Sequence, residues 1–145
     1  MTAMRKAMNA YGQAVETTPP ARQIVMLYDG ILRQIVNART AIESRRINDR
    51  CVAVQKATLI LEALQGCLDH EKGGDIAPQL DRLYTHYIFR LQAINLEDNP
   101  AVCDELHAQI SELRASWASI SESKPAPASA AKPSDRPSMS TAVTA

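Results

Sequence analysis

Residues 24–42 read IVMLYDGILRQIVNARTAI, and their apolar side chains recur at intervals of three and four residues. This is the period of one face of an α-helix, because about 3.6 residues complete each turn. The stripe comprises Ile24, Leu27, Tyr28, Ile31, Ile35, Ala38 and Ile42. The segment therefore predicts an amphipathic helix that buries one long face.

The same period returns in three later segments, and turn residues separate them. The first helix is expected over residues 20–46, because the prolines before it suit a helix start. Asn48 or Asp49 is expected to cap the second helix, and the glycines at 73–74 are expected to end it. Asp75 is the expected N-cap of the third helix. Asn99 and Pro100 together are expected to open the fourth.

Short connections make consecutive helices antiparallel neighbours, so the sequence predicts an all-α, up-down four-helix bundle over residues 19–122. Residues 1–18 are expected to form a short N-terminal amphipathic arm, because a helix of this length needs a surface to lie on. Residues 123–145 are rich in Pro, Ala and Ser, and we expect this C-terminal tail to be disordered.

The charges exclude some classes of partner. Sixteen basic and sixteen acidic residues give a net charge of zero, so nucleic acid is not an expected partner. Residues 20–47 hold five arginines and two acids, whereas residues 100–122 hold one arginine and four acids, which predicts that these two helices pair. No apolar run reaches the about 18 residues that indicate a span, so no membrane insertion is expected.

The candidate ligands for chemistry are sparse. The cysteines, Cys51, Cys67 and Cys103, are odd in number and lie within helical patterns, which indicates small core residues in a reducing cytoplasm. Asp104 and His107 have helical i, i+3 spacing, as do Cys67 and His70, but each pair supplies only two metal ligands. We expect no metal, no cofactor and no enzymatic activity.

The first helix carries more apolar side chains than a bundle helix needs. Val25, Leu32 and Val36 lie beside its core stripe at spacings of seven and four. They fit either a wide core face covered by the arm or a groove for a partner's amphipathic helix. Gly30 interrupts this helix, which fits either the close approach of another backbone or a tolerated weak position.

Several motifs in consistent order resemble FliS, the flagellin export chaperone family. They are Asn9-Ala10-Tyr11, MLYDG at residues 26–30, EKGGDIA at residues 71–77, Leu83-Tyr84, and Leu113 with Trp117. The resemblance covers residues 8–120. It implies a four-helix bundle that agrees with the periodicity.

The resemblance also implies a function. Members bind the disordered C-terminal segment of flagellin, which prevents premature polymerisation, and the complex is recognised by the cytoplasmic domain of the export-gate protein FlhA. For the flagellin groove, which is expected to involve the first and third helices, we expect Val25, Leu32, Val36, Tyr84 and Ile88. Met8 and Tyr11 match arm positions implicated in export-gate docking. The alternative is a helical adaptor that dimerises through its apolar stripe.

Overall fold

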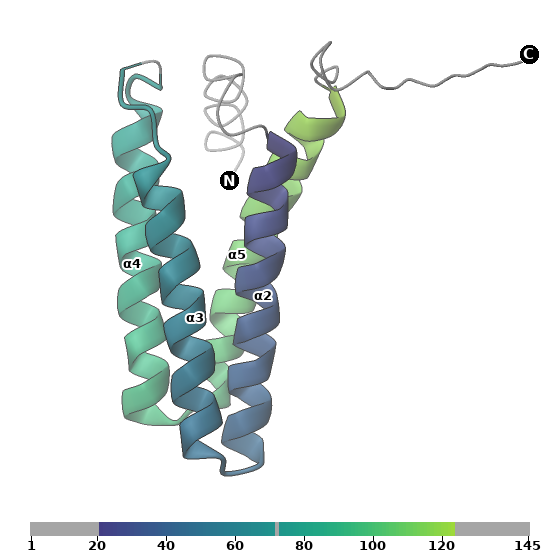
Figure 1. The fold of residues 1–145 in the computed structure, drawn as a ribbon, viewed down its shortest axis with the longest axis vertical. Helices are drawn as coiled ribbons and strands as arrows, with labels where there is room; N and C mark the ends of the chain where they lie inside the picture. Colours follow the sequence, from purple (N-terminus) through teal and green to yellow (C-terminus); the bar gives the residue numbers. More distant parts are fainter. Residues whose placement is uncertain (1–20, 72, 124–145) are drawn as a thin grey trace, which may run out of the picture.

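A computed structural model describes residues 21–71 and 73–123, which form four helices (Figure 1). They are α2 (Ala21–Glu43), α3 (Ile47–Gly66), α4 (Ile76–Glu97) and α5 (Pro100–Ser123). The predicted all-α bundle is confirmed. The arm and nearly all of the tail lie outside the described residues, so the predictions made for them stay predictions.

The turn between α2 and α3 ends the first helix earlier than predicted. The Arg46 amide donates to the Ala41 carbonyl at 2.8 Å and the Arg45 amide to the Ile42 carbonyl at 3.1 Å, which is the Schellman pattern of a helix C-terminus. Arg45 takes a left-handed φ of 59°. The α3 helix then starts at Ile47, so the predicted cap at residues 48–49 is wrong.

The other helix ends follow the sequence signals more closely. Asp75 does occupy the N-cap position of α4, although its side chain makes no capping hydrogen bond. Asn99 Oδ1 accepts from the Ala101 amide at 2.9 Å, ahead of Pro100 in the first turn of α5. The α3 helix ends at Gly66 rather than at residues 73–74, which lie in the connection to α4.

The four helices form a ring around one core. Helix α2 packs against α3 and α5, and α4 packs against the same two helices, so α2 and α4 are diagonal neighbours. The pair α3–α4 lies closest to α2 and α5 at the end with the two short turns and separates from them toward the other end (Figure 1). The predicted core stripes of α2 and α5 are buried, apart from half-buried Leu27 and Ile42.

The cysteines do not all lie in this core. Cys103 is buried, Cys51 is half-buried and Cys67 is exposed. The expectation for Cys67 is wrong: it is the C-cap residue of α3, at the end of the helix, and its side chain is exposed.

Candidate functional site

The residues predicted for the groove on the first helix form one strip beside α5. Val25, Leu32 and Val36 lie on the flank of α2 whose polar members contact that helix. Arg114 Nε donates to Asp29 Oδ1 at 2.6 Å, and Arg39 Nε donates to Asp104 Oδ1 at 2.7 Å. We call Val25, Leu32 and Val36 the α2/α5 strip.

One ion pair therefore lies within the strip and the other lies just beyond its C-terminal end. Asp29 lies between Val25 and Leu32 in sequence, and Arg39 follows Val36 by one helical turn. The pairing bears out the prediction that the basic first helix and the acidic last helix are neighbours. The guanidinium pKa of Arg39 and of Arg114 is raised, chiefly by the hydrogen bond to its carboxylate partner.

A pocket of about 280 Å³ opens beside the C-terminal end of the strip, with Val36 in its wall. Its lining is Ile35, Val36, Arg39, Cys103, Asp104, His107 and Ala108. Val36 is 48% exposed, whereas Val25 and Leu32 are half-buried against the core. Burial raises the pKa of the Cys103 thiol to about 11. The thiol is therefore protonated at neutral pH, and the pocket is suited to apolar contact rather than to thiolate chemistry.

The residue predicted for the groove on α4 lies on a different side of the bundle. Ile88 shares a flank of α4 with Thr85 and Gln92, whose side chains hydrogen-bond Gln65 and Thr58 of α3 at 2.8 and 3.4 Å. Ile88 therefore lies at the α3–α4 seam, and the α2/α5 strip lies at the α2–α5 seam. The first and third helices are diagonal in the ring, so the residues predicted on them lie at two different seams, and their role in binding flagellin stays a prediction.

Tyr84 is not on the surface in this structure. It is 1% exposed, and its hydroxyl lies 2.6 Å from the hydroxyl of Tyr28 across the core. Trp117 Nε1 donates to the same Tyr28 hydroxyl at 3.1 Å. Burial, followed by the proximity of Tyr84, raises the pKa of Tyr28 well above its ordinary value. This buried network joins α2, α4 and α5, so Tyr84 contributes to packing rather than to an open groove wall.

Gly30 makes room for a side chain rather than for a backbone. A Cβ at this position would lie 3.1 Å from the Ile60 Cδ1 atom of α3, and the described surroundings offer no closer backbone. The expectation of a close backbone approach is therefore wrong. Met8 and Tyr11, predicted for export-gate docking, lie outside the described residues.

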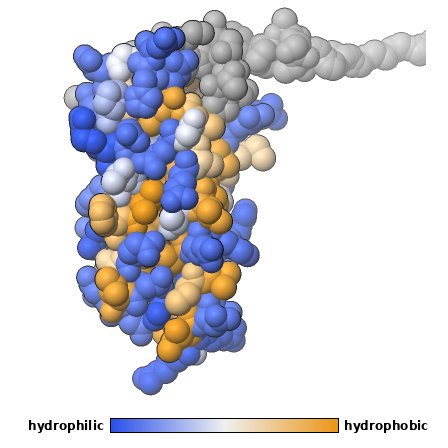
Figure 2. Space-filling view, turned by 60° about the vertical axis from the view of Figure 1, so that its left-hand side comes forward, coloured by the Kyte–Doolittle hydropathy of each residue, from blue (hydrophilic) through white to orange (hydrophobic). Residues whose placement is uncertain are grey.

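The sequence reasoning missed several exposed apolar side chains. Met26 on α2, Leu59 on α3 and Leu96 on α4 are all more than half exposed, as is Phe89. Figure 2 looks toward the side that carries α3 and α4 and shows apolar side chains interspersed with polar ones. Each of these residues lies on the side of its helix opposite the buried stripe, where polar residues are usual. Their exposure could therefore have been predicted from the sequence.

Two further features bear on function. Within residues 21–71 and 73–123, no three His, Cys, Asp or Glu side chains gather in a way that would hold a metal ion. In the same part of the chain, every helix is too short or too polar to cross a bilayer.

Comparison with known proteins adds the family context of this bundle. Residues 4–124 match the family described as flagellar protein FliS. The flagellar secretion chaperone FliSB of Pseudomonas aeruginosa is 36% identical over 121 residues, which cover 80% of this chain and 96% of that protein. The flagellar secretion chaperone FliS of Campylobacter jejuni is 38% identical over 117 residues, covering 79% and 90%. The FliS of Salmonella typhimurium is 34% identical over 120 residues, covering 79% and 89%.

Proposed function

This chain belongs to the FliS family of flagellar secretion chaperones, and from that premise we propose that it binds the disordered C-terminal segment of flagellin in the cytoplasm. Covering that segment prevents premature polymerisation and keeps flagellin available for the flagellar type III export gate. The cytoplasmic domain of FlhA is the proposed recipient of the complex.

The observation that carries the proposal is the α2/α5 strip. Its three apolar side chains extend over twelve residues of α2, from Val25 to Val36, and the eleven steps between the two ends span about 17 Å at the helical rise of about 1.5 Å per residue. That length matches about three turns of a partner helix, so an amphipathic segment can place successive anchors along it. The ion pair at Asp29 interrupts the strip between Val25 and Leu32, and the one at Arg39 ends it, so together they limit where an apolar face fits.

A second contact region follows from the position of Ile88. A flagellin segment long enough to wrap around the bundle meets the α2–α5 seam with one stretch and the α3–α4 seam with another. We assign Ile88 to the second stretch. Tyr84 supports both from the core, because its network ties α4 to α2 and α5.

The arm belongs to the same proposal. Residues 4–15 present Met8 and Tyr11 on an apolar face and act as an intramolecular competitor for the flagellin surface. A tethered segment acts at an effective concentration of up to about millimolar, so it masks the surface until a longer ligand with more anchors replaces it. The displaced arm then carries Met8 and Tyr11 to the export gate.

Calorimetric titration with a peptide of flagellin's C-terminal segment tests the function. We expect one-to-one binding with a negative heat-capacity change, because a disordered segment folds onto apolar surface. Leu32→Asp should weaken the binding strongly. Phe89→Asp is the matched control, since Phe89 is an exposed apolar residue on the outer face of α4. Absence of binding to the unaltered chain would refute the proposed client.

The alternative function is a helical adaptor that dimerises through an apolar stripe. The observation in its favour is the exposure of Phe89 and Leu96, which lie seven residues apart on α4. Sedimentation over a range of concentrations distinguishes the two functions. A mass that rises from monomer to dimer with concentration, and that stays at the monomer value in Phe89→Asp, supports the adaptor. A constant monomer mass supports the chaperone.

A further inference from the structure

The end of the bundle with the two short turns carries a basic pocket that the flagellin proposal does not use. Its volume is about 500 Å³. The lining residues are Ala41, Ile42, Arg45, Arg46, Ile47, Arg50 and Asp98. Three guanidinium groups therefore face one carboxylate, and no residue of the α2/α5 strip takes part. We call this the turn pocket.

One of the three cations is already neutralised. Arg50 is buried, and its Nη1 atom donates to Asp98 Oδ1 at 2.8 Å while its Nε atom donates to Asn95 at 3.1 Å. These bonds fix the Arg50 side chain to the end of α4. The carboxylate of Asp98 is thus engaged by Arg50, and it does not neutralise Arg45 or Arg46.

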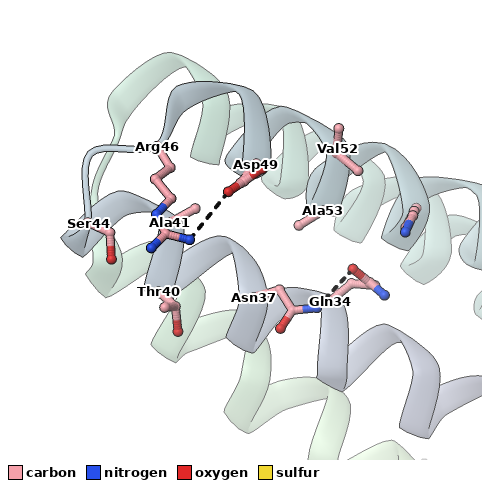
Figure 3. Close-up of a pocket in the computed structure, with 10 residues that line it drawn as sticks. Gln34, Asn37, Thr40, Ala41, Ser44, Arg46, Asp49, Val52 and Ala53 are labelled. Carbon is pink, nitrogen blue, oxygen red and sulfur yellow. Dashed lines mark hydrogen bonds and ion pairs between the residues drawn. The ribbon is translucent and has the colours of Figure 1, made fainter.

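Arg45 and Arg46 are accessible to a partner. Arg46 forms a long ion pair with Asp49 at 3.7 Å, and because these side chains are 69% and 60% exposed, the pair is weak and a partner's carboxylate can replace Asp49. Figure 3 shows Arg46 reaching from the turn over Ala41 toward Asp49, at the wall of an adjoining pocket. Arg45 is exposed, and its guanidinium has no carboxylate partner among the described residues.

The backbone at this pocket is strained in two places. Arg45 and Asp98 have φ values of 59° and 54°, and within the described residues they are the non-glycine residues with positive φ. Both line the turn pocket. Glycine is the favoured residue at the left-handed position of a Schellman turn, so an arginine there costs stability. Such strain gathers at functional sites, where the side chain has a use that glycine lacks.

An exposed apolar side chain borders the charges. Ile47 lines the pocket and is 65% exposed. A partner that meets this surface therefore encounters the exposed guanidinium groups of Arg45 and Arg46 next to a large apolar side chain. Nucleic acid prefers a broad basic face, and this chain has a net charge of zero.

We propose that the turn pocket is a second docking surface, which takes an acidic segment of a partner protein with carboxylates next to apolar side chains. Guanidinium groups bind carboxylates through strong, paired hydrogen bonds, and Ile47 contacts the neighbouring apolar residues. The turn pocket shares no residue with the α2/α5 strip, so the chain can bind one partner at each of these two surfaces.

The test uses the full chain and a fluorescent peptide of alternating glutamate and leucine, followed by anisotropy. Arg45→Gln and Arg46→Gln should each weaken peptide binding about tenfold, the loss expected for one charge-assisted hydrogen bond. Arg33→Gln is the matched control, because Arg33 is an exposed arginine of α2 outside the pocket, and it should leave affinity within about twofold. An equal loss in all three variants would show nonspecific attraction and overturn the proposal.

Arg45→Gly separates a binding role from a structural one. It should raise the urea midpoint of unfolding, because glycine relieves the left-handed strain, while it weakens peptide binding as Arg45→Gln does. A glycine variant with unchanged peptide affinity overturns the proposal. So does a short DNA duplex that binds more tightly than the peptide and loses affinity in the same variants, because the partner class would then be nucleic acid.

Discussion

Replacing Tyr28 by phenylalanine tests whether the buried network holds three helices together. The substitution keeps the aromatic ring and removes one hydroxyl. That hydroxyl accepts from Trp117 Nε1 at 3.1 Å and shares a hydrogen bond with the Tyr84 hydroxyl at 2.6 Å. Tyr28 is fully buried, so water does not replace the lost bonds.

The magnitude follows from these two bonds. Each hydrogen bond contributes about 0.5–1.5 kcal/mol net, so Tyr28→Phe should lower the free energy of unfolding by about 1–3 kcal/mol. Tyr87→Phe is the matched control. Tyr87 is also buried, but its hydroxyl makes no hydrogen bond to another described residue. The control should change the free energy of unfolding by less than about 0.5 kcal/mol.

Urea unfolding followed by tryptophan fluorescence measures both variants. Trp117 is the single tryptophan of the chain and is buried, so its emission reports the opening of this core. The denaturant dependence should stay unchanged, which would show that the surface exposed on unfolding is the same. If Tyr28→Phe costs no more than Tyr87→Phe, the network does not stabilise the bundle and the reasoning fails.

Three further predictions concern pH, helix packing and the arm. The contribution of Cys103 and Tyr87 to the free energy of unfolding should be constant below about pH 9 and fall from about pH 9 to 12, because burial raises the pKa of Cys103 from 9.0 to about 11 and that of Tyr87 from 10.0 to about 12, so the unfolded chain loses these protons first. Urea titrations at stepped pH check this, and a flat profile would contradict it. Gly30→Ala should stabilise the fold by up to about 1 kcal/mol, because the half-buried Ile60 methyl at 3.1 Å can rotate away; a loss above about 1 kcal/mol in urea unfolding would point to a rigid contact. Removal of residues 1–16 should raise or preserve affinity for the flagellin segment and increase self-association, measured by calorimetry and sedimentation. A large loss of affinity would instead show that the arm helps to bind the flagellin segment.

Much of the fold can be predicted from the sequence, because the helical spacing of apolar side chains shows which face of each helix is buried. The stripe from Ile24 to Ala38 is buried apart from Leu27, since side chains at these spacings share one face whatever lies opposite. The charge imbalance also predicted the pairing that Arg39 and Asp104 make. Helix ends were less predictable, because the Schellman turn at Arg45 uses a residue type that gives no turn signal.

The candidate site was harder to predict, because periodicity places a residue around its own helix and does not order the helices around the ring. Leu32 and Ile88 each lie next to a core stripe, so the sequence alone allows one shared groove. Their neighbours decide otherwise: Asp29, on the flank of Leu32, pairs with α5, and Thr85, on the flank of Ile88, bonds α3. Those contacts depend on tertiary packing that local spacing does not encode.

Two residues of the MLYDG motif serve the packing of the bundle. Tyr28 bonds Tyr84 and Trp117 in the core, and Gly30 accommodates Ile60. The surfaces proposed for partners use other positions, such as Val36 at the α2/α5 strip and Arg45 at the turn pocket. We therefore expect substitutions of Tyr28 to act mainly on stability, and substitutions of Val36 or Arg45 to act mainly on partner binding.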